Sequence, residues 1–167
     1  RAANQGLADA QYSLGWMYLN AKASNQDDTK AAHWFQRAAE QDHLKAQNNL
    51  AYMYAEGRGF AQDNLKAVEW YTRAAERGYA EAQFNMALIY ADGELVTKDP
   101  EQSFDWAKRA AEQGNGQAQR FLGACYEVGF GVPENATESA LWYAKAAQQG
   151  LERDGSIFSH IRQYPKP

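Results

Sequence analysis

Apolar and polar positions repeat along the chain with a period of 36 residues. An Ala-Ala pair recurs at 2/3, 38/39, 74/75, 110/111 and 146/147, and tryptophan recurs at 34, 70, 106 and 142. A fixed period in this range indicates a stack of copied supersecondary units rather than one globular core. The pattern predicts the tail of a truncated repeat at 1–6, followed by repeats at 7–42, 43–78, 79–114 and 115–150.

Each repeat contains two segments whose apolar residues recur at three- and four-residue spacings, as in amphipathic helices. First helices are predicted over 8–20, 44–56, 80–92 and 116–128, and second helices over 28–41, 64–77, 100–113 and 136–149. Short polar residues that can cap the second helices precede them: Asp27, Asp63, Asp99 and Asn135. The second helix of the second repeat is expected to bury Ala67, Trp70, Tyr71 and Ala74, and the four periodic tryptophans are expected to lie in the core.

Two helices per repeat predict an all-α fold, namely a right-handed α-solenoid of four helix-turn-helix units. One hairpin alone buries too little apolar surface to offset the entropy cost of ordering it, so neighbouring repeats must stabilise each other. After Gly150 the pattern decays. Residues 151–167 are predicted to form a degenerate capping helix and tail, which begins near Ser156 and is stopped by Pro165 and Pro167.

The composition restricts the function classes. The chain has 17 basic and 21 acidic residues and a net charge of −4, which argues against nucleic acid as the main partner. No apolar run approaches the roughly 20 residues of a membrane span. Cys125 is the single cysteine, so no internal disulfide can form. The three histidines, His33, His43 and His160, follow no metal-ligand spacing, and no metal, cofactor or catalytic constellation is predicted.

The segments Ala80-Glu-Ala-Gln83 through Tyr90 and Asp63 through Gly78 resemble the Sel1-like repeat family, a relative of the tetratricopeptide repeats. The resemblance covers residues 1–150. It implies a non-catalytic scaffold or adaptor for a protein or peptide partner, as a monomer or weak dimer. Such proteins are frequent in bacterial envelope, secretion or signalling assemblies, so the resemblance favours the bacterial envelope or periplasm, with the cytoplasm as the alternative. One departure is Leu95-Val96, where the family has a glycine loop.

The resemblance also suggests where a partner binds. In related solenoids the first helices line a concave groove, and here their variable positions combine aromatic and amide side chains, which suit binding hot spots and pairing with a peptide backbone. The predicted peptide-binding residues are Tyr12, Trp16, Asn48, Asn49, Tyr52, Phe84, Asn85, Leu88 and Arg120. In the fourth repeat, Phe121 and Ala124 are expected on the same face.

Simpler explanations remain open for these residues. Tyr12 and Trp16 can pack on a preceding repeat, and the asparagines can be solvated surface. A basic row near the ends of the second helices is expected to interact with helix dipoles and nearby acids rather than with an anionic ligand: Arg37, Arg73, Arg109 and Lys145.

Two other functions stay open as alternatives. A hydrolytic enzyme with its site in the groove would need convergent titratable groups, whereas the sequence offers only the scattered Asp9, Lys45, Glu81 and Arg120. A structural spacer between other domains would need no partner in the groove.

Overall fold

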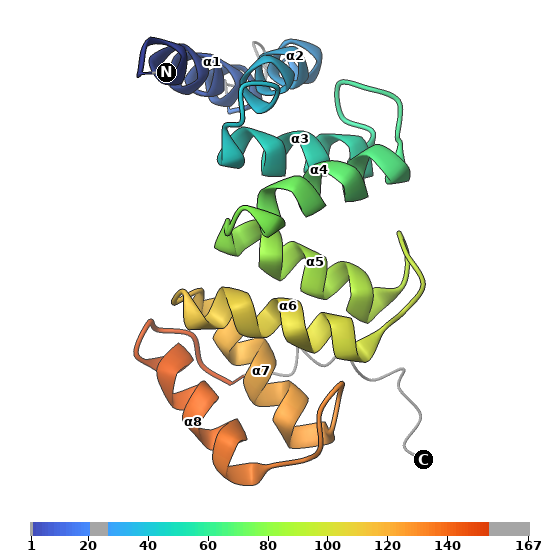
Figure 1. Cartoon of the computed structure of the whole chain (residues 1–167), viewed down its shortest axis with the longest axis vertical. Helices are drawn as coiled ribbons and strands as arrows, with labels where there is room; N and C mark the ends of the chain where they lie inside the picture. The colour runs from blue at the N-terminus through green and yellow to red at the C-terminus, as the bar shows by residue number, and fades with distance from the viewer. Residues whose placement is uncertain (1, 21–26, 154–167) are drawn as a thin grey trace. The chain divides into compact units, whose positions relative to one another are not determined.

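The computed structural model of the chain describes residues 2–20 and 27–153 (Figure 1). All regular secondary structure in these residues is helical. The eight helices are α1 (Ala2–Leu19), α2 (Asp28–Ala39), α3 (Leu44–Glu56), α4 (Asn64–Glu76), α5 (Ala80–Asp92), α6 (Pro100–Glu112), α7 (Gly116–Val128) and α8 (Ala136–Ala147). The bounds of α3, α5 and α7 equal the predicted ones, and the second helices start where predicted but end one or two residues earlier.

Two differences from prediction lie at the ends of the chain. Helix α1 begins at Ala2, six residues before its predicted start, so residues 2–6 continue the first helix. Leu151–Arg153, at the start of the predicted capping helix, are not helical. The rest of that predicted helix, including Ser156, Pro165 and Pro167, lies outside the described residues.

The helices form hairpins within two units, Arg1–Tyr79 and Ala80–Pro167. In the first unit α1 pairs with α2 and α3 with α4, and α2 packs on α3. Phe35, Leu50 and Met53 are fully buried there. The second unit repeats this arrangement, with α5 paired to α6, α7 paired to α8, and α6 packed on α7. Sequence-adjacent hairpins therefore lean on each other within each unit, as the repeat pattern predicts.

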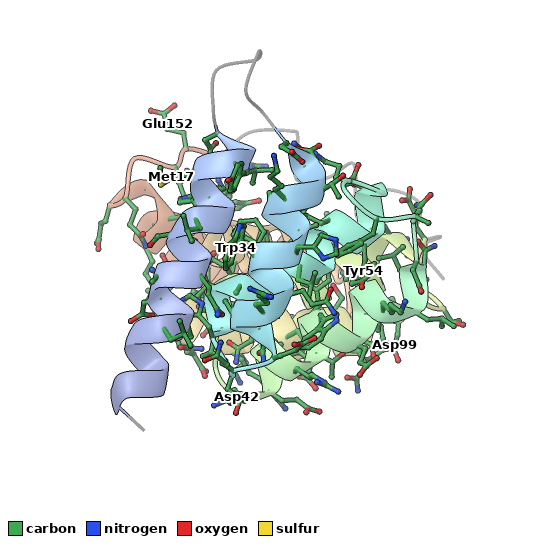
Figure 2. The ribbon with its side chains drawn as sticks, turned by 90° about the horizontal axis from the view of Figure 1, so that it is seen from above. Met17, Trp34, Asp42, Tyr54, Asp99 and Glu152 are labelled. Carbon is green, nitrogen blue, oxygen red and sulfur yellow. The ribbon has the colours of Figure 1, made fainter. Side chains whose placement is uncertain are left out.

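The predicted caps are confirmed. The side chains of Asp27, Asp63 and Asp99 accept hydrogen bonds from backbone N–H groups three residues ahead, and Asn135 accepts from the second and third N–H groups of its helix. At the other end of the hairpin, glycines adopt left-handed backbone conformations, and Asp42, which Figure 2 labels, adopts one (φ 65°) where the pattern lacks a glycine.

Small residues permit close approach inside the repeats, as predicted. A Cβ atom on Gly123 would lie 2.8 Å from the ring of Tyr143. Gly131 has φ 69°, and a Cβ atom there would overlap the carbonyl oxygen of Pro100, at the start of the preceding second helix. The equivalent Leu95 does not use a left-handed conformation, so its loop differs from the glycine loops.

The predicted burial of the second helices holds for most positions. Ala67, Tyr71 and Ala74 are buried, and so are Trp106 and Trp142. Trp34, which Figure 2 labels, and Trp70 are only half-buried, so the prediction that all four tryptophans are core residues is wrong for the first unit. A cation lies over the ring of each of the four tryptophans, as described below, so this contact does not distinguish the half-buried rings from the buried ones.

Buried glutamines connect the two helices of a hairpin. The Nε2 groups of Gln41, Gln113 and Gln149 donate to the Oε1 atoms of Gln11, Gln83 and Gln119 at 2.6, 2.7 and 2.9 Å. The second repeat departs from this pattern, because its donor position is Arg77. There, Gln47 is 1% exposed and its Oε1 has no hydrogen-bond partner among the described residues, whereas its Nε2 donates to the carbonyl of Ala39.

Candidate protein-binding surface

First helices of consecutive repeats meet through their variable positions. In the first unit, Tyr12 of α1 stacks on His43 at the start of α3, with ring centroids 4.6 Å apart, and its hydroxyl interacts with Asn49. In the second unit, Phe84 of α5 makes an edge-to-face contact with Phe121 of α7 at 6.0 Å. Asn49 follows Tyr12 by 37 positions and Phe121 follows Phe84 by the same interval. Equivalent positions of consecutive first helices therefore meet in each unit, through a polar pair in the first and an aromatic pair in the second.

Tyr12 is packed against residues of its own repeat and of the following one. Its ring packs on the following repeat, through His43, and also lies 5.7 Å from the ring of Phe35 on α2. Burial raises the pKa of Tyr12, an effect that the Asn49 amide opposes. Tyr12 is thus held in place within the first unit.

His43 contacts Tyr12 and was not identified from the sequence as part of a site. Its Nδ1 accepts the N–H of Ala46 at 3.1 Å and so caps α3, while its Nε2 lies 3.1 Å from Oδ1 of Asp9. Burial lowers the pKa of His43, against the opposing effect of the Asp9 carboxylate. A neutral imidazole with its proton on Nε2 satisfies both contacts. The capping role of His43 could have been predicted from the sequence, because His43 lies two periods before Asn115, which caps α7 in the same way.

Two predicted residues present exposed aromatic rings. The side chains of Trp16 and Tyr52 are 47% and 41% exposed. Trp16 stacks on Tyr12 with centroids 6.4 Å apart, and the guanidinium of Arg58 lies over the ring of Tyr52 at 6.0 Å. Arg58 is itself fixed by two 2.9 Å hydrogen bonds to the carboxylate of Asp28. Both rings are therefore supported from one side and open on the other.

The other predicted residues are half-buried: Asn48, Asn49, Phe84, Asn85, Leu88 and Arg120. Arg120 donates to Oε1 of Gln117 at 2.9 Å. Phe121 and Ala124 are fully buried, so the expectation that they contribute to the same accessible face is wrong. Phe121 packs between Phe84 and Phe130, at 6.0 and 6.3 Å, which removes it from the surface.

The basic row has a structural role that the sequence analysis missed. Each cation lies over the ring of the tryptophan three residues earlier, at 5.2 Å for Arg37, 4.6 Å for Arg73, 4.6 Å for Arg109 and 3.8 Å for Lys145. Such cation–π contacts stabilise the pair and shield the ring from water. The repeated i, i+3 spacing of Trp and Arg or Lys was the available signal. The row therefore needs no anionic ligand to explain it.

The described residues bring together no group of three or more His, Cys, Asp or Glu side chains that could hold a metal ion. The Asp9–His43 pair has no free ring nitrogen to act as a base, because Nδ1 is engaged by Ala46. Cys125 is buried, and burial raises the pKa of its thiol, which disfavours the nucleophilic thiolate. In the part of the chain that the structure describes, no helix is long and apolar enough to cross a membrane.

The fold and this surface define a helical-hairpin repeat protein, and comparison with known proteins gives its family. The chain belongs to the Sel1 repeat family, which matches residues 8–43, 44–79, 80–115 and 116–151. These bounds lie one residue after the repeats assigned from the sequence. The family is typically one of protein–protein interaction scaffolds.

Solved structures agree with the family assignment. A Sel1 repeat protein from Oxalobacter formigenes is 33% identical over 95% of this chain and 72% of its own, with a TM-score of 0.79. The protective antigen c5321 of uropathogenic Escherichia coli strains, which displays an SLR fold, is 35% identical over 98% of this chain, with a TM-score of 0.80. The chain spans only 39% of c5321.

A more distant structure, the immunity protein PA5088 from Pseudomonas aeruginosa, shares the fold at 19% identity with a TM-score of 0.57. No match is found among curated proteins. The repeat matches and the similar structures confirm the predicted class, an all-α solenoid of four helical hairpins.

Proposed function

We propose that the chain is a non-catalytic interaction module that binds a peptide or protein segment along the variable face of its first helices. The observation that carries this proposal is the pair of exposed rings, Trp16 and Tyr52, at equivalent positions of consecutive first helices. Exposed aromatic side chains are enriched among the residues that dominate binding energy. The half-buried amide of Asn48, one turn before Tyr52 on α3, is of a type that can both donate to and accept from an extended chain.

The support of these rings favours binding over simple exposure. Trp16 rests on Tyr12, and Tyr52 lies under Arg58, which is fixed by Asp28. A ring that is already held in place loses little side-chain entropy when a partner covers it. Membership of the Sel1 repeat family is in keeping with a protein partner, and so is the fold shared with PA5088, which is an immunity protein.

Site-specific photo-crosslinking tests the proposal. A photoreactive phenylalanine analogue at Tyr52 is expected to crosslink one discrete protein in extracts of the source cells, and excess unlabelled wild-type chain is expected to suppress the product. The Trp16→Ala/Tyr52→Ala chain should fail to suppress it. The matched control is the analogue at Leu65 on α4, which is 84% exposed but lies on a second helix. Equal crosslinking from both positions, or competition by the double variant, would contradict the proposal.

A further inference from the structure

A hollow of about 340 Å³ lies in the fourth repeat, bordered by α7, the loop that follows it, and α8. Its walls combine aromatic rings, carboxylates and one cation. The residues that the argument uses are Tyr126, Glu127, Glu134, Tyr143 and Arg153. They all belong to the second unit.

The repeat pattern does not require a carboxylate at this place. Glu127 occupies the position of Ala55 and Ala91 in the second and third repeats, whereas Tyr143 is an aromatic residue that the second repeat also has, as Tyr71. Alanine at the position of Glu127 is sufficient for a hairpin to form, because α3 and α5 form with it. The fourth repeat therefore has a charged group at a position where the fold itself needs only a small apolar one.

The carboxylate of Glu127 is held by two different partners. The hydroxyl of Tyr143 donates to its Oε2 at 2.9 Å, and burial, together with this bond, raises the pKa of Tyr143, so the hydroxyl keeps its proton at neutral pH. The guanidinium of Arg153 bonds to Oε1 of the same carboxylate. Its central carbon also lies 5.6 Å from the centroid of the Tyr143 ring. Within the carboxylate of Glu127, Oε2 is thus held by Tyr143 of the same hairpin, and Oε1 binds the cation.

Arg153 does not belong to the hairpin that builds the hollow. It comes from the non-helical segment after α8, and 60% of its side chain is exposed. We propose that the hollow is a recognition site for an arginine side chain of a protein partner, and that Arg153 occupies it in cis. The partner's arginine would replace Arg153 against Glu127 and Tyr143.

The chemistry of the walls selects a guanidinium. A guanidinium group can bond to a carboxylate and stack on an aromatic ring at the same time, because it is planar and its charge is delocalised. Glu134, which also lines the hollow, adds negative charge and disfavours an acidic side chain. The hollow is in the second unit, whereas Trp16 and Tyr52 are in the first, so its test is independent of the proposed first-helix surface.

The test measures binding of the peptide acetyl-Gly-Arg-Gly-amide to the whole chain. Binding is followed in NMR titrations by the chemical-shift changes of the backbone amides of Glu127 and Tyr143. The Arg153→Ala chain is expected to bind the peptide about tenfold more tightly than the wild type, because a charge-assisted contact of this kind amounts to about a tenfold difference in affinity. The matched control is Glu152→Ala, which removes the exposed neighbour of Arg153 and should bind as the wild type does (Figure 2).

Two comparisons make the result specific to charge. The same peptide with citrulline, which has the shape of arginine without the charge, should cause no shifts at Glu127 or Tyr143. The chain with both Arg153→Ala and Glu127→Gln should bind the arginine peptide about tenfold more weakly than the Arg153→Ala chain. Equal affinity of the wild type and Arg153→Ala, equal binding of citrulline, or undiminished binding with Glu127→Gln would each overturn the proposal. Far-UV circular dichroism establishes that each variant keeps its helices.

Discussion

Replacing Arg77 with glutamine should stabilise the second repeat. In the other three repeats a glutamine at this position donates its Nε2 to the buried glutamine of the first helix. Gln47 lacks that donor, and its Oε1 is buried without a hydrogen bond from any described residue. A buried acceptor left unsatisfied costs about 1–3 kcal/mol. The substitution removes the Arg77–Asp42 ion pair, whose side chains are 48% and 71% exposed, and such exposed pairs contribute only about 0–1 kcal/mol.

The expected net result is an increase of about 1–2 kcal/mol in the free energy of unfolding, measured by urea denaturation followed by far-UV circular dichroism. Arg77→Ala separates the two effects, because it removes the ion pair without supplying a donor and should not stabilise. The mirror variant Gln113→Arg should destabilise the chain by a similar amount, since it removes the donor to Gln83. If Arg77→Gln is no more stable than Arg77→Ala, the glutamine pair does not contribute as argued.

Further predictions concern a loop and a cap. Gly114→Ala should destabilise the chain by about 1–2 kcal/mol, because alanine is strained in a left-handed conformation. Gly131→Ala should destabilise it by more than this amount. Both glycines have left-handed backbones, but only at Gly131 would the added Cβ overlap Pro100, so equal losses in urea denaturation would contradict this packing. Lowering the pH from about 7.5 to 5.5 should reduce stability through His43. Burial lowers its pKa in the folded chain, so the unfolded chain binds more protons below about 6.5. His43→Asn, which copies the cap of Asn115, should keep stability at neutral pH and reduce this pH dependence.

The sequence predicted most of the local structure because the deciding interactions lie within one repeat. The caps Asp63 and Asp99 bond to N–H groups three residues away, and Asp42 ends a helix in the conformation that glycine uses elsewhere. Such short-range chemistry recurs wherever the same residue type does. A cap can therefore be predicted from the sequence of one repeat, and the same residue type at the same position of the next repeat supports the prediction.

Burial could not be predicted in the same way, because it depends on which helices surround a position. Leu14 and Leu50 are equivalent by sequence, yet Leu14 is 37% exposed and Leu50 is fully buried, since α3 lies between α2 and α4. Phe121 shows the opposite error. It occupies a variable position, which the sequence analysis assigned to the accessible face, but the rings of Phe84 and Phe130 enclose it.

The departures from the repeat pattern carry information that its matches do not. A position that stays constant from copy to copy reports what the hairpin needs to fold, as at the tryptophans covered by a cation three residues later. A position that changes without disturbing the hairpin is free for another use. Trp16 and Tyr52 change in this way, and so does Glu127, where the second and third repeats have alanine. Arg77 is the useful contrast: its change leaves a buried oxygen unpaired, and the loss should appear in stability rather than in binding.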